Sequence, residues 1–158
     1  MAILHRVRHP GLAAALLGLI ALAAGCDRRE GPEPSLLPDS ALRAELGLTD
    51  ADLVYRITIV GGPGESLDPA QVEVPPGAWL EFVSGDWRVH VVRFEADSLS
   101  GPPLAFLHDT DQMESPPLVS RDARYVVSFA GAPQARYPFV VEGNGELARG
   151  VVVVRSRR

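Results

Sequence analysis

Residues 71–92, QVEVPPGAWLEFVSGDWRVHVV, constrain the fold of this chain more than any other stretch. Apolar and polar residues alternate on both sides of two breaks, at 75–77 and 84–86, and a period of two is typical of half-buried strands. Proline cannot donate to a strand ladder and glycine favours turns, so Pro-Pro-Gly ends the first strand. The stretch therefore predicts strand, turn, strand, loop and strand.

The same alternation recurs along much of the chain. It predicts further strands over 54–60, 124–129, 136–141 and 150–155, separated by glycine- and proline-containing turns. About seven strands at this spacing predict an all-β fold, a Greek-key β-sandwich. Two short segments interrupt the pattern. Residues 40–46 are a candidate helix or a partly ordered linker, and residues 102–111 are a candidate helical insertion.

The first 25 residues have the pattern of a secretory signal. A basic opening precedes an apolar run over 11–24, which is shorter than the roughly 20 residues that span a membrane. The run ends in Leu-Ala-Ala-Gly-Cys, which resembles a bacterial lipoprotein cleavage site. That resemblance implies that Cys26 is lipidated and becomes the mature N-terminus; an ordinary signal peptide cut nearby or an uncleaved anchor is the alternative. Residues 26–52 are then the lipidated cysteine, a tether and the candidate helix, and residues 53–156 form the sandwich.

These features predict where the protein resides and what it contacts. A lipid on Cys26 would anchor the chain to a membrane of the bacterial cell envelope, facing the extracytoplasmic space. From Cys26 onward the chain has 13 arginines, no lysine and 20 acidic residues, a net charge of −7. This balance argues against nucleic acid as a partner. The expected partners are the membrane, through Cys26, and an envelope protein whose identity the sequence does not give.

The strand pattern resembles a known family, the cupredoxins, which are plastocyanin- and azurin-like copper proteins. The resemblance covers roughly residues 54–154, and it rests first on a proline-containing entry, alternating strands and an Asp-x-x-x-His step. It rests also on a Tyr-x-Phe strand, a tight loop and a valine-rich last strand. The residues that carry it are Leu67, Pro69, Val72, Val74, Gly77, Leu80, Phe82, Asp86, His90, Tyr137 and Phe139. It implies a sandwich of cupredoxin type, with His90 at the position of the first copper ligand.

The other positions of that copper site carry different residues. Val141 stands at the cysteine position, Asn144 at the second histidine position, and Glu-Leu-Ala over 146–148 in the methionine region. A blue copper centre needs a thiolate and two imidazoles with a weak axial ligand. Valine has no ligating atom and a neutral amide is a poor copper ligand. The sequence therefore predicts a degenerate site without type 1 copper and without any other cofactor.

Another metal site remains an alternative from sequence alone. His90, His108 and Met113, with nearby carboxylates, would form a weak copper site if the insertion folded over the end of the sandwich. The chain would then be a copper-binding, copper-handling or electron-transfer cupredoxin. Against this, a single histidine on a strand is usually a hydrogen-bonded structural residue, and an acidic loop is usually solvated.

The chemistry of an enzyme is not evident in the sequence. The chain has no cysteine nucleophile after Cys26, no Gly-x-Ser-x-Gly elbow and no phosphate loop. We therefore expect a non-catalytic binding or structural module. Trp87, Arg88, Tyr137 and Asn144 are candidates for its interaction surface, because aromatic residues and arginine are enriched at interfaces. Trp79 is either covered by the segment 40–46 or is a second exposed aromatic anchor.

Overall fold

The computed structural model describes residues 40–143 and 145–156; the predicted signal peptide, Cys26, most of the tether and Asn144 lie outside them. Within this part the chain forms eight strands, two α-helices and one short 3-10 helix. In chain order they are α1 (Ser40–Leu46), β1 (Val54–Gly61), β2 (Glu65–Asp68), β3 (Gln71–Val74), β4 (Trp79–Ser84), β5 (Val91–Phe94), η2 (Ala96–Ser98), α2 (Pro102–Asp109), β6 (Arg124–Ser128), β7 (Arg136–Glu142) and β8 (Ala148–Val154).

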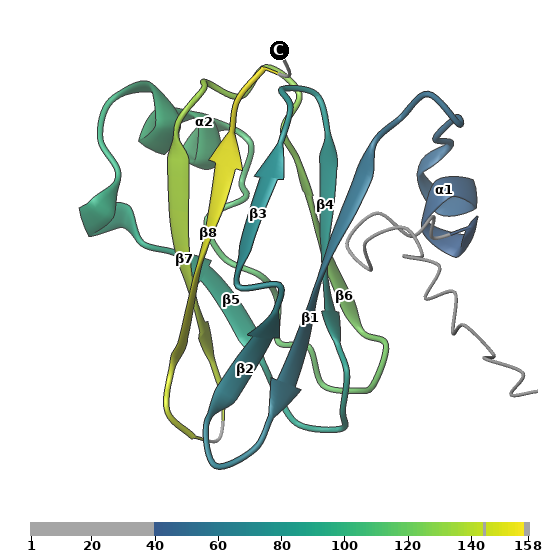
Figure 1. Cartoon of the computed structure of the whole chain (residues 1–158), viewed down its shortest axis with the longest axis vertical. Helices are drawn as coiled ribbons and strands as arrows, with labels where there is room; N and C mark the ends of the chain where they lie inside the picture. The colour runs from purple at the N-terminus through teal and green to yellow at the C-terminus, as the bar shows by residue number, and fades with distance from the viewer. Residues whose placement is uncertain (1–39, 144, 157–158) are drawn as a thin grey trace, which may run out of the picture.

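The strands form two four-stranded sheets, in the orders β2-β1-β4-β6 and β3-β8-β7-β5 (Figure 1). Neighbouring strands are antiparallel except for two pairs, β1 with β4 and β3 with β8. Both parallel pairs arise because the chain changes sheet between β2 and β3 and again between β3 and β4. The predicted all-β sandwich, with short helical pieces, is confirmed.

The alternation in the sequence places apolar side chains between the two sheets. In β3, Val72 and Val74 are buried while the intervening residues are exposed. At the centre, Phe82 lies edge-to-face with Phe94 and with Phe139, with ring centroids 6.5 and 5.0 Å apart. These rings come from β4, β5 and β7, so one aromatic cluster joins the two sheets, an arrangement that aromatic quadrupoles favour.

Two strands differ from the prediction. Residues 65–68 form β2, which returns on β1 with Ile59 opposite Leu67. Its sequence, ESLD, has little apolar alternation, and the backbone ladder at the sheet edge holds it. The predicted strand from Arg88 begins only at Val91 as β5. Residues 85–90 instead form a loop, because the side chain of Asp86 binds the backbone there.

The helices cover opposite parts of the sandwich (Figure 1). The first candidate segment is helical: Leu42 is buried, Leu46 is 39% exposed, and Gly47 with a φ of 65° follows the last turn. The insertion also contains the predicted helix, α2, which ends two residues earlier than expected. Its Leu107 is fully buried in the core. No helix among residues 40–143 and 145–156 is long and apolar enough to cross a membrane.

Candidate functional site

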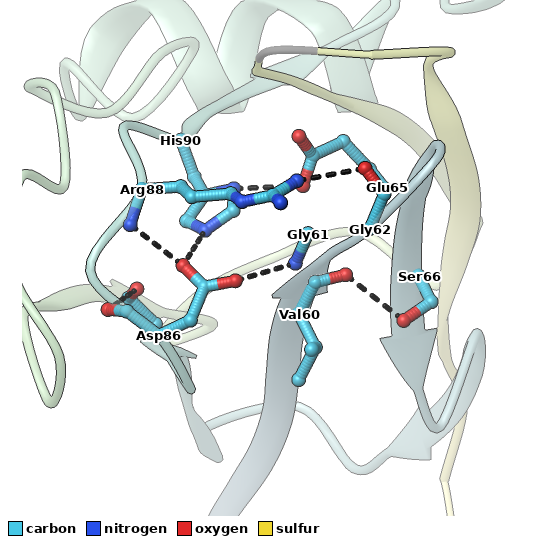
Figure 2. Close-up of polar contacts among 9 residues, drawn as sticks. Val60, Gly61, Gly62, Glu65, Ser66, Asp86, Arg88 and His90 are labelled. Carbon is cyan, nitrogen blue, oxygen red and sulfur yellow. Dashed lines mark hydrogen bonds and ion pairs between the residues drawn. The ribbon is translucent and has the colours of Figure 1, made fainter.

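Asp86 organises the loop between β4 and β5. One carboxylate oxygen, Oδ2, accepts the backbone N–H of Gly61 at 2.7 Å, and the other, Oδ1, accepts the backbone N–H of Arg88 at 2.7 Å. Oδ1 also lies 2.9 Å from Nε2 of His90 (Figure 2). The carboxylate therefore joins the end of β1 to both halves of the loop, using its capacity to accept several hydrogen bonds.

His90 lies between two carboxylates that come from different parts of the chain. Its side chain has no exposed surface, and Nε2 faces Asp86. On the other side of the ring, Nδ1 lies 2.8 Å from Oε2 of Glu65, whose side chain is 1% exposed. The direction of this second contact is poorly aligned for a hydrogen bond, so it is best described as a close imidazole–carboxylate contact. Both ring nitrogens are thus occupied inside the fold.

Glycine admits the carboxylate of Glu65 into this position. A Cβ atom at Gly143 would lie 2.0 Å from Oε1 of Glu65 and 2.9 Å from the carbonyl oxygen of Val89. The backbone N–H of Glu65 donates to the carbonyl oxygen of Glu146 at 2.9 Å. The start of β2 is therefore in contact with the turn between β7 and β8 as well as with His90.

The surroundings of Asp86 favour its ionised form. Partial burial opposes ionisation, but hydrogen bonds from the backbone of Arg88, from His90 and from the backbone of Gly61 outweigh it and lower the pKa of Asp86 to about 2. Because the ionised carboxylate only accepts hydrogen bonds, Nε2 of His90 carries a proton. The side chain of Arg88 also joins the loop to the end of β1, because Nη1 donates to the carbonyl oxygen of Gly62 at 2.7 Å (Figure 2).

These residues do not fit a type 1 copper ion. Val141, at the position where the family resemblance places the thiolate, is fully buried and apolar. Nδ1 of His90 is in contact with Glu65, so a metal would have to displace a buried carboxylate before it could bind there. The second histidine position, Asn144, lies outside the described residues and has an amide in any case. The donor set lacks the sulfur and the second imidazole that this centre requires.

The alternative metal ligands lie apart from one another. The backbone N–H of Phe94 donates to the carbonyl oxygen of Met113, whereas His90 pairs with Leu118. Met113 is therefore displaced from His90 by four residues of extended chain, about 13 Å. His108 is exposed on α2, at the far end of the sandwich (Figure 1). In the part of the chain that the structure describes, no three His, Cys, Asp or Glu side chains are grouped so as to hold a metal ion.

Apolar side chains are exposed around the loop that carries Asp86. Trp87 is 75% exposed, the largest exposure among the exposed large hydrophobic residues of the described chain. The antiparallel bridge between His90 and Leu118 places Val89 opposite Val119, and both of these valines are exposed. We call Trp87, Val89 and Val119 the Trp87 patch. The patch shares Trp87 with the predicted interaction surface, and it adjoins Arg88, which is also part of that prediction.

Tyr137 does not belong to that surface, and this part of the prediction is wrong. Its side chain is fully buried, its hydroxyl donates to the carbonyl oxygen of Pro133 at 2.8 Å, and its ring contacts Phe106 and Phe129. It is the second residue of β7, whereas the loop with Trp87 leads into Val91, which pairs with Glu142 at the other end of β7. Trp79 is partly buried, so it is not the freely exposed anchor that was the alternative.

Sequence reasoning missed Glu65 as a residue of the site. It lies 25 positions before His90, in a segment without strong strand signals. A glutamate beside a Gly-Gly-Pro-Gly turn normally remains in solvent, since carboxylates are rarely fully buried. The close approach at Gly143 is the structural signal, and it becomes visible only when β2 and the β7–β8 turn are placed together.

Comparison with known proteins finds similarity to solved structures. No family model matches the chain, and no curated protein matches it. Among solved structures, the chain is similar to a purple cupredoxin from Nitrosopumilus maritimus, at 18% identity and a TM-score of 0.43, over 63% of this chain and 98% of that one.

A fern plastocyanin variant is similar at 14% identity and a TM-score of 0.47, over 63% of this chain and 99% of that one. A variant of amicyanin in its reduced Cu(I) form is similar at 18% identity and a TM-score of 0.44, over 77% of this chain and 95% of that one. These three similar structures are cupredoxins.

Proposed function

We propose that this protein is a non-catalytic lipoprotein of the bacterial cell envelope, whose cupredoxin-like domain acts as a binding or structural module without type 1 copper. The observation that carries the proposal is the position of His90, with both ring nitrogens against carboxylates of its own chain. Imidazole is the side chain that most often transfers protons in catalysis. The imidazole of His90 is fully buried, so a substrate in solution does not reach it.

A copper titration tests the metal-free part of this proposal. The mature chain would be titrated with Cu(II), and with Cu(I) under reducing conditions, while visible absorption, electron paramagnetic resonance and thermal unfolding are followed. A ligand that binds only the folded state raises the melting temperature, so we expect no saturable rise and no thiolate charge-transfer band. Stoichiometric binding that is lost in both His90→Ala and His108→Ala would refute the proposal and favour copper handling.

The membrane anchor is proposed from the sequence around Cys26. Two or more acyl chains hold a protein stably on a bilayer, whereas one chain does not. Cells supplied with radiolabelled palmitate should incorporate the label into the wild-type chain, and the Cys26→Ala variant should lose both the label and membrane fractionation. Label retained in Cys26→Ala would contradict lipidation at this residue.

The Trp87 patch is the proposed contact for an envelope protein. A large aromatic ring that is already exposed and held on a hydrogen-bonded loop makes a favourable binding residue, because little entropy is lost on docking. A photoreactive amino acid placed at Trp87 or Val119 should crosslink to one protein in intact cells. The same probe at Leu46, exposed on α1, is the control. Equal crosslinking from all three positions would argue against this surface.

A further inference from the structure

We infer that Glu65, His90 and Asp86 form an internal bracket of two carboxyl groups and one imidazole, in which the carboxyl group of Glu65 lies against Nδ1 of His90 and fastens three separate segments at one end of the sandwich. The inference concerns the same histidine as the proposed function, but it depends neither on the lipid anchor nor on a partner. The copper and crosslinking experiments and the unfolding experiments below can therefore fail independently.

The bracket joins segments that are distant in sequence. Asp86 fixes the loop before β5 to the end of β1 through the backbone N–H of Gly61. Nε2 of His90 contacts Asp86, and Nδ1 contacts Glu65 at the start of β2 (Figure 2). The backbone N–H of Glu65 then binds the carbonyl oxygen of Glu146, in the turn before β8. Side-chain contacts at His90 thereby connect both sheets.

Burial explains why the three side chains act as a unit. The side chains of His90 and Glu65 are 0% and 1% exposed, and that of Asp86 is 22% exposed. A buried carboxylate is costly unless it is paired, and removal of one partner from a buried pair destabilises a protein more than the pair stabilises it. Nδ1 of His90 lies 2.8 Å from Oε2 of Glu65. The imidazole is therefore the group that offsets the free-energy cost of burying this carboxyl group.

The close packing at Gly143 fits the same reasoning. A Cβ atom at this residue would lie 2.0 Å from Oε1 and 2.7 Å from the carboxylate carbon of Glu65. Any larger residue at position 143 would push the carboxylate away from His90. Thus Glu65 is held between an imidazole on one side and a glycine backbone on the other, and it is not a surface acid that happens to lie near the histidine.

The principal test is thermal unfolding of Glu65→Gln, which keeps the size of the side chain and removes its charge. We expect the melting temperature to fall by about 5–10 °C for a chain of this size. Glu73→Gln is the matched control, because Glu73 pairs with Arg155 on the exposed surface, where an ion pair contributes little. A fall no larger than that of the control would overturn the bracket.

The decisive test is the same substitution in a His90→Phe background. Without the imidazole, nothing offsets the cost of burying the carboxyl group of Glu65. In this background, Glu65→Gln should leave the melting temperature unchanged or raise it. A fall as large as in the wild type would show that the two residues act independently, and this would refute the inference. Gly143→Ala should lower the melting temperature of the wild type.

Nuclear magnetic resonance of the ring nitrogens keeps the inference testable if His90→Phe does not fold. In the wild type, we expect the Nε2 proton to be protected from exchange with water, because it faces Asp86 inside the fold. Glu65→Gln should shift the Nδ1 resonance of His90 and leave Nε2 bound to its proton. An unchanged Nδ1 resonance would mean that Glu65 does not contact the ring, which would also overturn the proposal.

Discussion

Asp86→Asn should destabilise the protein strongly although it replaces only one atom. The carboxylate presents oxygen atoms to hydrogen-bond donors on both sides: Oδ2 to the backbone of Gly61, and Oδ1 to the backbone of Arg88 and to His90. Asparagine has one oxygen and one NH2 group. In either orientation of the amide, the NH2 group therefore faces at least one N–H donor, and that donor loses its acceptor.

The expected cost of the substitution follows from two figures for the same hydrogen bonds. A buried donor left without an acceptor costs about 1–3 kcal/mol. The lowered pKa of Asp86, about 2 against 3.8, corresponds to about 1–2 kcal/mol of stability at neutral pH, once solvent screening of a partly exposed side chain is allowed for. Both figures describe the same hydrogen bonds to the carboxylate, so they are not added, and the expected loss in the free energy of unfolding is about 1–3 kcal/mol. This is a fall of about 4–12 °C in melting temperature for a domain of this size.

Denaturant and thermal unfolding at several pH values measure this cost and its dependence on the ionisation of Asp86. Because the folded-state pKa of Asp86 is lowered, its ionised form stabilises the fold above about pH 4, and this stabilisation is lost as the pH falls towards 2. The difference in the free energy of unfolding between the wild type and Asp86→Asn should therefore decrease as the pH falls from about 4 towards 2. Asp97→Asn, at an exposed position of η2, is the control. A cost below about 0.5 kcal/mol at pH 7, typical of an ordinary surface substitution, would refute the reasoning.

Three further predictions concern residues outside the loop that carries Asp86. Tyr137→Phe should cost about 1 kcal/mol in chemical denaturation, because the hydrogen bond to Pro133 is lost; no loss would mean that the hydroxyl contributes nothing. Burial raises the pKa of Tyr125 and of Tyr137 to about 12, so the phenolate absorbance that these two residues contribute in the folded protein should develop near pH 12, and stability should decrease from about pH 10 upward. Ionisation of either residue near pH 10 in the folded state would contradict this. Leu107→Ala should cost about 2–5 kcal/mol, because the side chain is fully buried, whereas Leu46→Ala on α1 should cost much less; equal costs would show that the insertion is loosely packed.

Local sequence was sufficient to predict most strands. Apolar residues at every second position mark the buried faces of β3 and β4. These residues are Val72, Val74, Leu80 and Phe82, and all four are buried. A period of two identifies a half-buried strand wherever a sheet has one face against the core. The strand β2 lacks this signal because its short segment, Glu65–Asp68, is held at a sheet edge by backbone hydrogen bonds with β1.

The candidate site was predicted only in part. The Asp-x-x-x-His step correctly drew attention to Asp86 and His90, which do contact each other. Tyr137 was assigned to the surface because an aromatic residue beside arginine resembles an interface. In the fold, its ring completes a cluster with Phe106 of the insertion. Spacing along the chain did not reveal that contact, because it depends on how residues 95–117 pack.

The sequence by itself determined which ligands this chain can offer: Val141 and Asn144, where the family resemblance places a thiolate and an imidazole, cannot supply either group in any fold. It also marked most of the strands that form the sandwich. Only the tertiary structure decided that Glu65 meets Nδ1 of His90 and that Gly143 leaves room for its carboxylate. Residue types limit the available chemistry locally, but burial and pairing of charges arise from contacts between segments that only folding brings together.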